Sequence, residues 1–174
     1  MQLGNLSFLS EGNEENEMDV DFLLYLSFQY FRTKRMKQSV KESLGEHISL
    51  FTDFEDAFNI IVLLVSTVFG YSIYNLIKSN EFFCYLIKNT TGTAFITGDQ
   101  PVVNIHAVFS GETSELALYY PLSPTTALLL TKEKNCNIEC SVEKVKEYND
   151  LIEQQSLALI FANEESDLYQ YKAE

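Results

Sequence analysis

The pattern of apolar and polar positions divides the chain into a helical first half and a strand-rich second half. After Glu17, apolar residues recur at helical spacing at Phe22, Leu23, Leu26 and Tyr30. The basic segment Arg32–Lys37 that follows suits the second half of a helix, where the helix dipole favours positive charge. The pattern therefore predicts one helix that begins near Glu17 and ends near Gly45.

A second helix is predicted over Ala57–Ile77, a run of 21 residues without a charge. This run is long enough to cross a bilayer. Polar or small residues interrupt it, however, and its flanks lack the aromatic and basic residues that anchor membrane spans. We therefore expect a buried central helix that is capped near Asp53, and no membrane span; a span is the alternative.

After Ser79 the pattern changes to that of short strands. Strands are predicted at Glu81–Lys88, Ala94–Thr97, Val102–Val108, Leu116–Tyr120 and Thr126–Thr131. The segment Asn89–Gly92, between the first two strands, is typical of a hairpin turn. Ser141 is the predicted N-cap of a helix over Val142–Gln155, which leads to a last strand at Leu157–Ala162.

The order of these elements predicts a single α+β domain over residues 17–174. It contains two N-terminal helices, a mostly antiparallel sheet, and a late helix followed by a final strand. Residues 1–16 are polar and acidic without periodicity, so they are predicted to form a flexible acidic arm.

The charge balance narrows the choice of partner. The 12 basic and 25 acidic residues give a formal net charge of −13, which repels the phosphate backbone of nucleic acids. Six acids and no base lie between Met1 and Asp21. This acidity favours a protein partner or a small polar substrate over a nucleic acid.

The cysteines and histidines indicate neither a secreted protein nor a metal site. The three cysteines (Cys84, Cys136 and Cys140) are an odd number in a sequence that opens without a signal-peptide pattern, so we expect a cytoplasmic protein. Cys136 and Cys140 make only half of a zinc site, and His47 and His106 lie in unrelated contexts. No metal is predicted, and the sequence indicates no particular cofactor.

The segment Phe95–Pro101 carries the most informative polar residue. An apolar strand runs into a Gly-Asp turn, and Pro101 forces Gln100 into an extended conformation. Asp99 therefore lies at a strand end, where scaffolds often carry a site carboxylate. The alternative, which we favour, is that Asp99 accepts hydrogen bonds from turn amides.

Four segments carry motifs that occur together in one bacterial family. Phe95–Val102 resembles F-x-T-S-D-N-P-V, Tyr120–Pro124 resembles P-L-S-P, Phe28–Thr33 resembles F-x-x-x-R-T-P, and Lys146–Asn149 with Leu159–Phe161 resembles a closing helix and strand. Their order and spacing resemble those of the family catalogued as domain of unknown function 4238. Lys34, Gly98 and Gln100 stand where the family has Pro, Ser and Asn. The family's opening H-Y-V-P-like segment is missing, so the chain resembles a shortened member of the family or one part of a split gene.

The resemblance singles out Asp99, Arg32 and Asn149 as candidate catalytic residues. If they converge, they offer a carboxylate as base, a guanidinium for a phosphate, and an amide for orientation. Such a cluster suits a hydrolase or nuclease-like domain of a bacterial defence system or mobile element. The alternatives are a structural network, in which Arg32 pairs with Asp99, and a non-enzymatic acidic module that binds a partner or regulates it.

Overall fold

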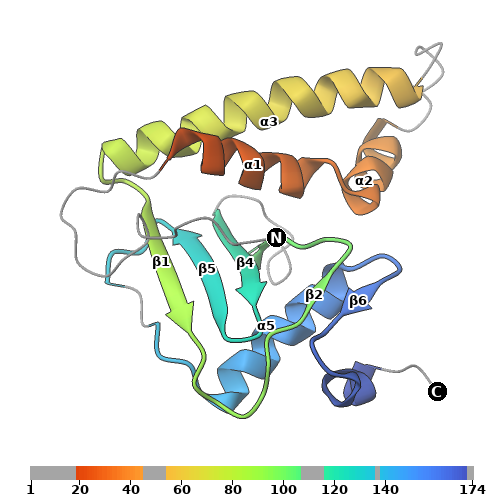
Figure 1. Cartoon of the computed structure of the whole chain (residues 1–174). Helices are drawn as coiled ribbons and strands as arrows, with labels where there is room; N and C mark the ends of the chain where they lie inside the picture. The colour runs from red at the N-terminus through yellow and green to blue at the C-terminus, as the bar shows by residue number, and fades with distance from the viewer. Residues whose placement is uncertain (1–18, 45–53, 107–115, 136–137, 172–174) are drawn as a thin grey trace.

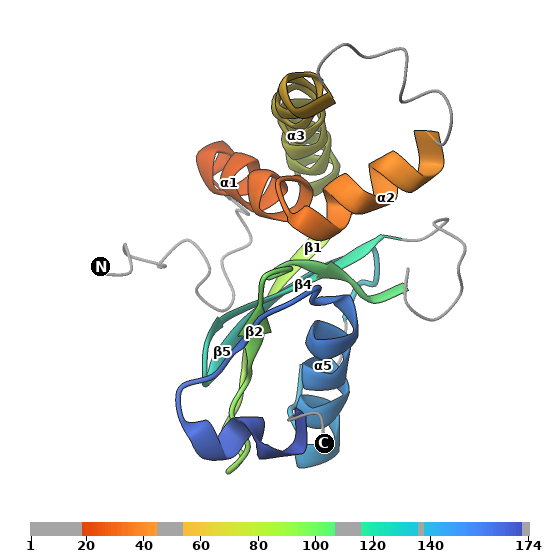
Figure 2. The same ribbon diagram turned by 90° about the vertical axis from the view of Figure 1, so that its right-hand side faces the viewer.

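The computed structural model describes residues 19–44, 54–106, 116–135 and 138–171. Figures 1 and 2 show three layers, in which helices α1 (Val20–Phe31) and α3 (Phe54–Lys78) cover one face of the main sheet and helix α5 (Val142–Gln155) covers the other. Helix α2 (Lys34–Leu44) lies beyond the end of α1. The predicted α+β class is confirmed. The predicted acidic arm, residues 1–16, and the predicted cap near Asp53 lie outside the described residues.

The first helical region is two helices, α1 (Val20–Phe31) and α2 (Lys34–Leu44), so the prediction of one continuous helix was wrong. Helix α1 ends at Arg32, and the hydroxyl of Thr33 then accepts a hydrogen bond from the amide of Met36 at 3.2 Å. Thr33 thus acts as the N-cap of α2, although the helical spacing of apolar residues in the sequence continues past it. Lys34 follows it at the first helical position, where proline is also favoured, which accounts for the R-T-P form of the motif.

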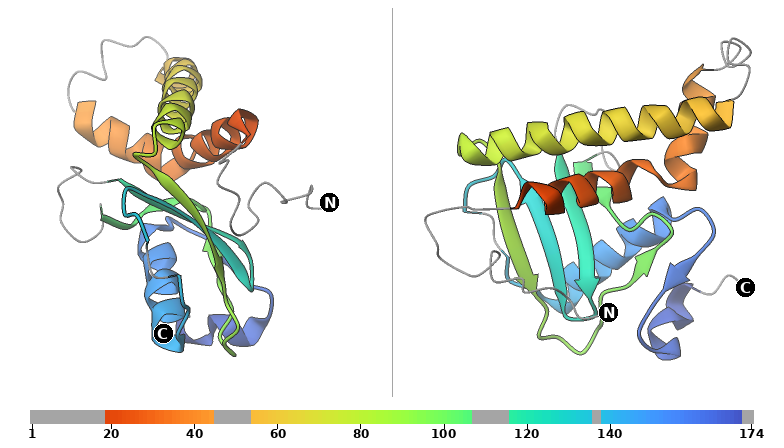
Figure 3. Two further views of the ribbon diagram at one scale, coloured as in Figure 1. Left: turned by 90° about the vertical axis from the view of Figure 1, so that its left-hand side faces the viewer. Right: turned by 45° about the horizontal axis from the view of Figure 1, so that its top comes forward.

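Helix α3 (Phe54–Lys78) lies along the outside of the helical layer (Figure 3). Its inner face packs against α1, and a Cβ atom added at Gly70 would lie 2.9 Å from Leu24 Cδ2 and 3.2 Å from Leu24 Cα. The predicted helix is therefore present. The prediction that it is buried was wrong, because only 28% of its most apolar window of 18 residues is buried.

The main sheet has the strand order β1-β5-β4-β3, and all neighbours are antiparallel. The strands are β1 (Phe83–Lys88), β3 (Val103–Asn104), β4 (Ala117–Ser123) and β5 (Thr126–Thr131). A separate pair joins β2 (Thr97–Gly98) to β6 (Ile160–Phe161).

The predicted hairpin across Asn89–Gly92 was wrong, because β1 pairs with β5 rather than with the next strand. The amide of Asn89 donates to the carbonyl of Thr125 at 2.8 Å, and its side chain donates to the carbonyl of Thr93 at 2.7 Å. Asn89 therefore bends the chain towards the β4–β5 turn, which the P-L-S-P motif forms.

The two faces of the sheet support two apolar cores. Leu118, Leu128 and Leu130 point towards α1 and α3, whereas their neighbours Tyr119 and Leu129 point towards α5. Because side chains alternate along a strand and both faces are covered, β4 and β5 are apolar at nearly every position.

The C-terminal part begins with α5 (Val142–Gln155), as predicted. The predicted N-cap is confirmed, since the Ser141 hydroxyl accepts a hydrogen bond from the amide of Lys144 at 3.2 Å. Strand β6 is shorter than the predicted Leu157–Ala162, and a 3-10 helix, η3 (Glu165–Tyr171), follows it.

Candidate functional site

Asp99 binds the chain that follows α5. Its carboxylate accepts hydrogen bonds from the amides of Leu157 at 2.8 Å and Ala158 at 3.0 Å. Its own amide donates to the carbonyl of Leu159 at 3.0 Å. Asp99 thus fixes the loop between α5 and β6 against the end of β2, although these backbone amides are about 60 residues away in sequence.

Asn149 is buried, with 1% of its surface exposed, and holds α5 against the segment before β2. Its Oδ1 atom accepts a hydrogen bond from the amide of Ile96 at 3.1 Å, and its Nδ2 atom donates to the carbonyl of Ala94 at 2.9 Å. Both ends of the amide are therefore occupied by backbone groups.

Arg32 lies at the end of α1, where its Nη2 atom donates to Gln29 Oε1 at 3.0 Å. Among the described residues the structure records no ion pair between Arg32 and Asp99. The three residues named from the motifs therefore make separate contacts, and their catalytic roles stay a prediction.

The motifs nevertheless meet, through the neighbours of the predicted residues. The hydroxyl of Thr33 donates to Gln100 Oε1, and Gln100 Nε2 donates to the carbonyls of Val102 at 2.7 Å and Tyr30 at 3.3 Å. Gln100 is 3% exposed. The signal missed in the sequence is the amide at position 100, which joins the α1–α2 junction to the turn after β2.

Gly98 explains one difference from the family motif. A Cβ atom at this position would lie 1.9 Å from Ser156 Oγ and 3.0 Å from the carbonyl oxygen of Leu159. The hydroxyl of Ser156 occupies that space and donates to the carbonyl of Ile152 at 2.7 Å. A serine at position 98, as in the family motif, would therefore collide with Ser156.

A hollow of about 650 Å³ lies beside the N-terminal end of α5. Its floor is apolar and includes Leu129 and Tyr148, the latter stacked on the buried Tyr119 with ring centroids 4.3 Å apart. Its polar lining residues are His106, Thr131, Glu133, Glu139, Cys140, Ser141 and Lys144. Neither Asp99, Arg32 nor Asn149 lines this hollow.

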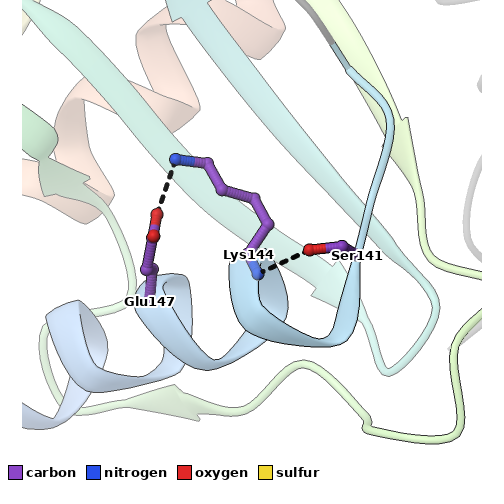
Figure 4. A network of polar contacts seen from close by, with 3 residues as sticks. All are labelled: Ser141, Lys144 and Glu147. Atoms are coloured by element: carbon purple, nitrogen blue, oxygen red, sulfur yellow. Dashed lines mark hydrogen bonds and ion pairs between the residues drawn. The ribbon is translucent and has the colours of Figure 1, made fainter.

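The polar groups that line the hollow form a polar surface, and they do not activate Cys140 as a nucleophile. Burial raises the pKa of the Cys140 thiol, against the opposing effect of Lys144, whereas a nucleophilic thiol needs a lowered pKa. Lys144 Nζ pairs with Glu147 Oε2 at 2.8 Å, and its amide is held by Ser141 (Figure 4). Within the described ranges no group of three or more His, Cys, Asp or Glu could hold a metal; Cys136 and His47 lie outside them.

The outer face of α3 is a further feature that the sequence did not predict. It consists of six apolar side chains that are between 39% and 66% exposed: Ile60, Leu63, Leu64, Val65, Val68 and Tyr71. The hydroxyls of Thr67 and Ser72 donate to the carbonyls of Leu63 and Val68, at 2.7 and 2.8 Å. The outer face therefore combines uncharged side chains with hydroxyls that are already hydrogen-bonded.

By length and composition alone, α3 could also cross a membrane, since its mean hydropathy reaches 2.0 over 18 residues. Its inner face, however, belongs to the core between the helices and the sheet, through Ile73 and Ile77. A spanning helix would have to leave that core.

Replacing Asp99 by alanine is expected to lower the free energy of unfolding by about 2 kcal/mol, because two charge-assisted hydrogen bonds at a half-buried position are lost. Urea denaturation measures this change. Asp99→Asn, which keeps one acceptor oxygen, should lose about half as much. Unchanged stability in both variants would contradict the structural role and favour a role in a functional site.

The comparisons with known proteins agree with the motif resemblance. The family model described as protein of unknown function (DUF4238) matches residues 13–166. No curated protein and no solved structure matches the chain. The matched region includes the Thr33–Gln100 junction, both backbone contacts of Asn149 and the amides that Asp99 binds. Because the match covers most of the chain, the chain belongs to the family of proteins of unknown function DUF4238.

Proposed function

We propose that this chain is a non-enzymatic module that binds a protein partner, and that the outer face of α3 is its docking surface. The partner chemistry that fits is an amphipathic helix whose apolar side covers Leu63, Leu64 and Val68. This choice selects the partner-binding alternative over a hydrolase that acts through Asp99, Arg32 and Asn149. We place the module in the cytoplasm, and a regulatory role in a defence system or mobile element is compatible with it.

The exposed apolar surface is the observation that carries the proposal. Single exposed apolar residues are common in soluble proteins, but a contiguous apolar patch marks an interaction site. Six such residues share one helix face here, and no charged residue interrupts α3 between Ala57 and Ile77. A partner helix would remove this surface from water and gain roughly 25 cal/mol per Å² covered.

The contacts of the motif residues support the same choice. The carboxylate of Asp99 and both ends of the Asn149 amide are bound to backbone groups, as expected for residues that hold a fold together. The net charge of −13 makes a nucleic acid an unfavourable ligand, because its phosphates would be repelled.

Binding of a labelled leucine–lysine peptide that forms an amphipathic helix tests the proposal. Fluorescence anisotropy should show saturable binding to the full chain in about 0.5 M salt, where the screening length is only about 4 Å and charge attraction is weak. Leu64→Glu should raise the Kd at least 10-fold, because a carboxylate then lies in the centre of the docking surface.

Leu159→Glu is the matched control, since Leu159 is 55% exposed and Leu64 is 60% exposed, but Leu159 lies outside α3. This variant carries the same added charge and should bind the peptide like the unmodified chain. Equal binding by all three proteins, or no binding by any of them at a concentration at which the chain is a monomer, would sink the proposal.

A further inference from the structure

We propose that the occupant of the outer face of α3 is the same face of a second copy, so that two chains pair through antiparallel α3 helices. This inference rests on the proposed function, because it names the partner of that docking surface. It goes further by fixing the symmetry of the complex and the residues that face one another across it.

The size of the outer face suits a small, specific interface. If a fully exposed large side chain offers about 200 Å², the six exposed fractions correspond to at most roughly 650 Å² per copy. A pair would then cover at most roughly 1,300 Å², the lower end of the range for specific complexes. A two-fold pair needs only one self-complementary surface, which a uniform apolar stripe provides.

The order of charges along α3 selects the antiparallel arrangement. At helical spacing, the stripe through Ile60, Leu64 and Tyr71 begins at Asp56 and ends at Lys78. Parallel helices would place acid beside acid and lysine beside lysine. Antiparallel helices place opposite charges together at both ends. The dipoles of the two helices then point in opposite directions, which is the favourable arrangement.

The centre of the stripe fixes the register. A two-fold axis at Thr67 lies midway between Asp56 and Lys78, which are 22 positions and roughly 33 Å apart along the helix. This axis brings Asp56 level with Lys78 of the other copy, and Leu63 level with Tyr71. The Thr67 hydroxyl, bonded to the Leu63 carbonyl, can be covered at the axis without losing its hydrogen bond.

A lipid surface is a less favourable occupant. Anionic membranes attract basic residues, whereas the first turn of α3 holds Glu55 and Asp56. Insertion across a bilayer would remove Ile73 and Ile77 from the core beneath the helices. A second copy covers the outer face and leaves that core intact.

Sedimentation equilibrium of the full chain, from micromolar to several hundred micromolar, tests the pairing. The mass should rise from 19.9 kDa to about twice that value. Leu64→Glu should raise the dimer Kd at least 30-fold, because two carboxylates would then lie near the two-fold axis. Leu159→Glu, the matched control, should leave the Kd unchanged.

Charge reversal tests the orientation. Asp56→Lys should weaken the pair several-fold, because lysine then faces Lys78 at both ends, and Asp56→Lys combined with Lys78→Asp should restore it. If Leu64→Glu disrupts the pair but the single reversal leaves it unchanged, the antiparallel register is wrong.

Two further outcomes separate this inference from the proposed function. A chain that stays monomeric at every concentration but binds the leucine–lysine peptide would overturn the proposed pairing of two copies and would support the docking surface. A monomer that floats with zwitterionic phosphatidylcholine vesicles, and loses this property on Leu64→Glu, would assign the face to lipid and overturn both proposals.

Discussion

Asn149→Ala is expected to lower the free energy of unfolding by about 3 kcal/mol, because the amide of Ile96 and the carbonyl of Ala94 both lose their partner. The position is 1% exposed, so water cannot replace the side chain without entering the core between the sheet and α5. Thermal unfolding followed by circular dichroism should show a midpoint lowered by about 6–12 °C.

Two further variants test the cause of that loss. Gln154→Ala removes an exposed amide from the same helix and should change the stability by less than about 0.5 kcal/mol. Asn149→Asp keeps an oxygen that accepts from the amide of Ile96. Its carboxyl can donate to the carbonyl of Ala94 only when it is protonated. An ionised carboxylate at this buried position would face the carbonyl of Ala94, so this variant should gain stability relative to the unmodified chain as the pH falls and the carboxylate is protonated. A variant as stable at neutral as at acidic pH would contradict the donor role.

Gly70→Val should have a similarly large effect, again about 3 kcal/mol, because α1 and α3 cross where no side chain fits. The added Cβ atom would meet Leu24 Cδ2 at 2.9 Å and Ser27 Oγ at 3.1 Å, and the branched methyl groups would reach farther. The helices would have to separate, which would expose Leu23 and Ile73. Urea denaturation, with the midpoint compared at constant slope, measures the change.

Gly92→Val is the matched control for this substitution. A Cβ atom at Gly92 would meet no atom within 4 Å. The same valine should therefore change the stability by less than about 0.5 kcal/mol. Equal losses at positions 70 and 92 would show that the cost arises from the loss of glycine itself and not from the helix crossing.

The bounds of helices and strands were predicted best where the local sequence pattern and the tertiary environment favour the same element. Helix α5 follows its Ser141 cap, and β5 matches its predicted bounds, because an apolar run of that length is buried on both faces. The helix break at Thr33 was missed, since the apolar period continues past it and only the hydroxyl contact with Met36 and Gln100 marks the boundary.

The errors elsewhere concern which residues meet, a property that local patterns do not contain. The turn after β1 looked like a hairpin because Asn89 and Gly92 are typical turn residues. The partner of β1 is instead β5, through pairs such as Phe83 with Thr131. Asp99 and Gln100 are adjacent but have different partners, since Asp99 binds the amides of Leu157 and Ala158 whereas Gln100 contacts Thr33. The α1–α2 junction therefore meets position 100 and not Asp99.

The order of strands in the sheet has a consequence for synthesis of the chain on the ribosome. Leu23 and Leu26 of α1 are covered by Leu128 and Leu130 of β5, which emerge more than one hundred residues later. Strand β2 must also wait for β6, which follows it by 64 residues, since Thr97 pairs with Phe161. The nascent helices must therefore remain without their sheet until most of the chain has been made. Because domains form as units, we expect chaperone contacts to concentrate on α1 during that interval.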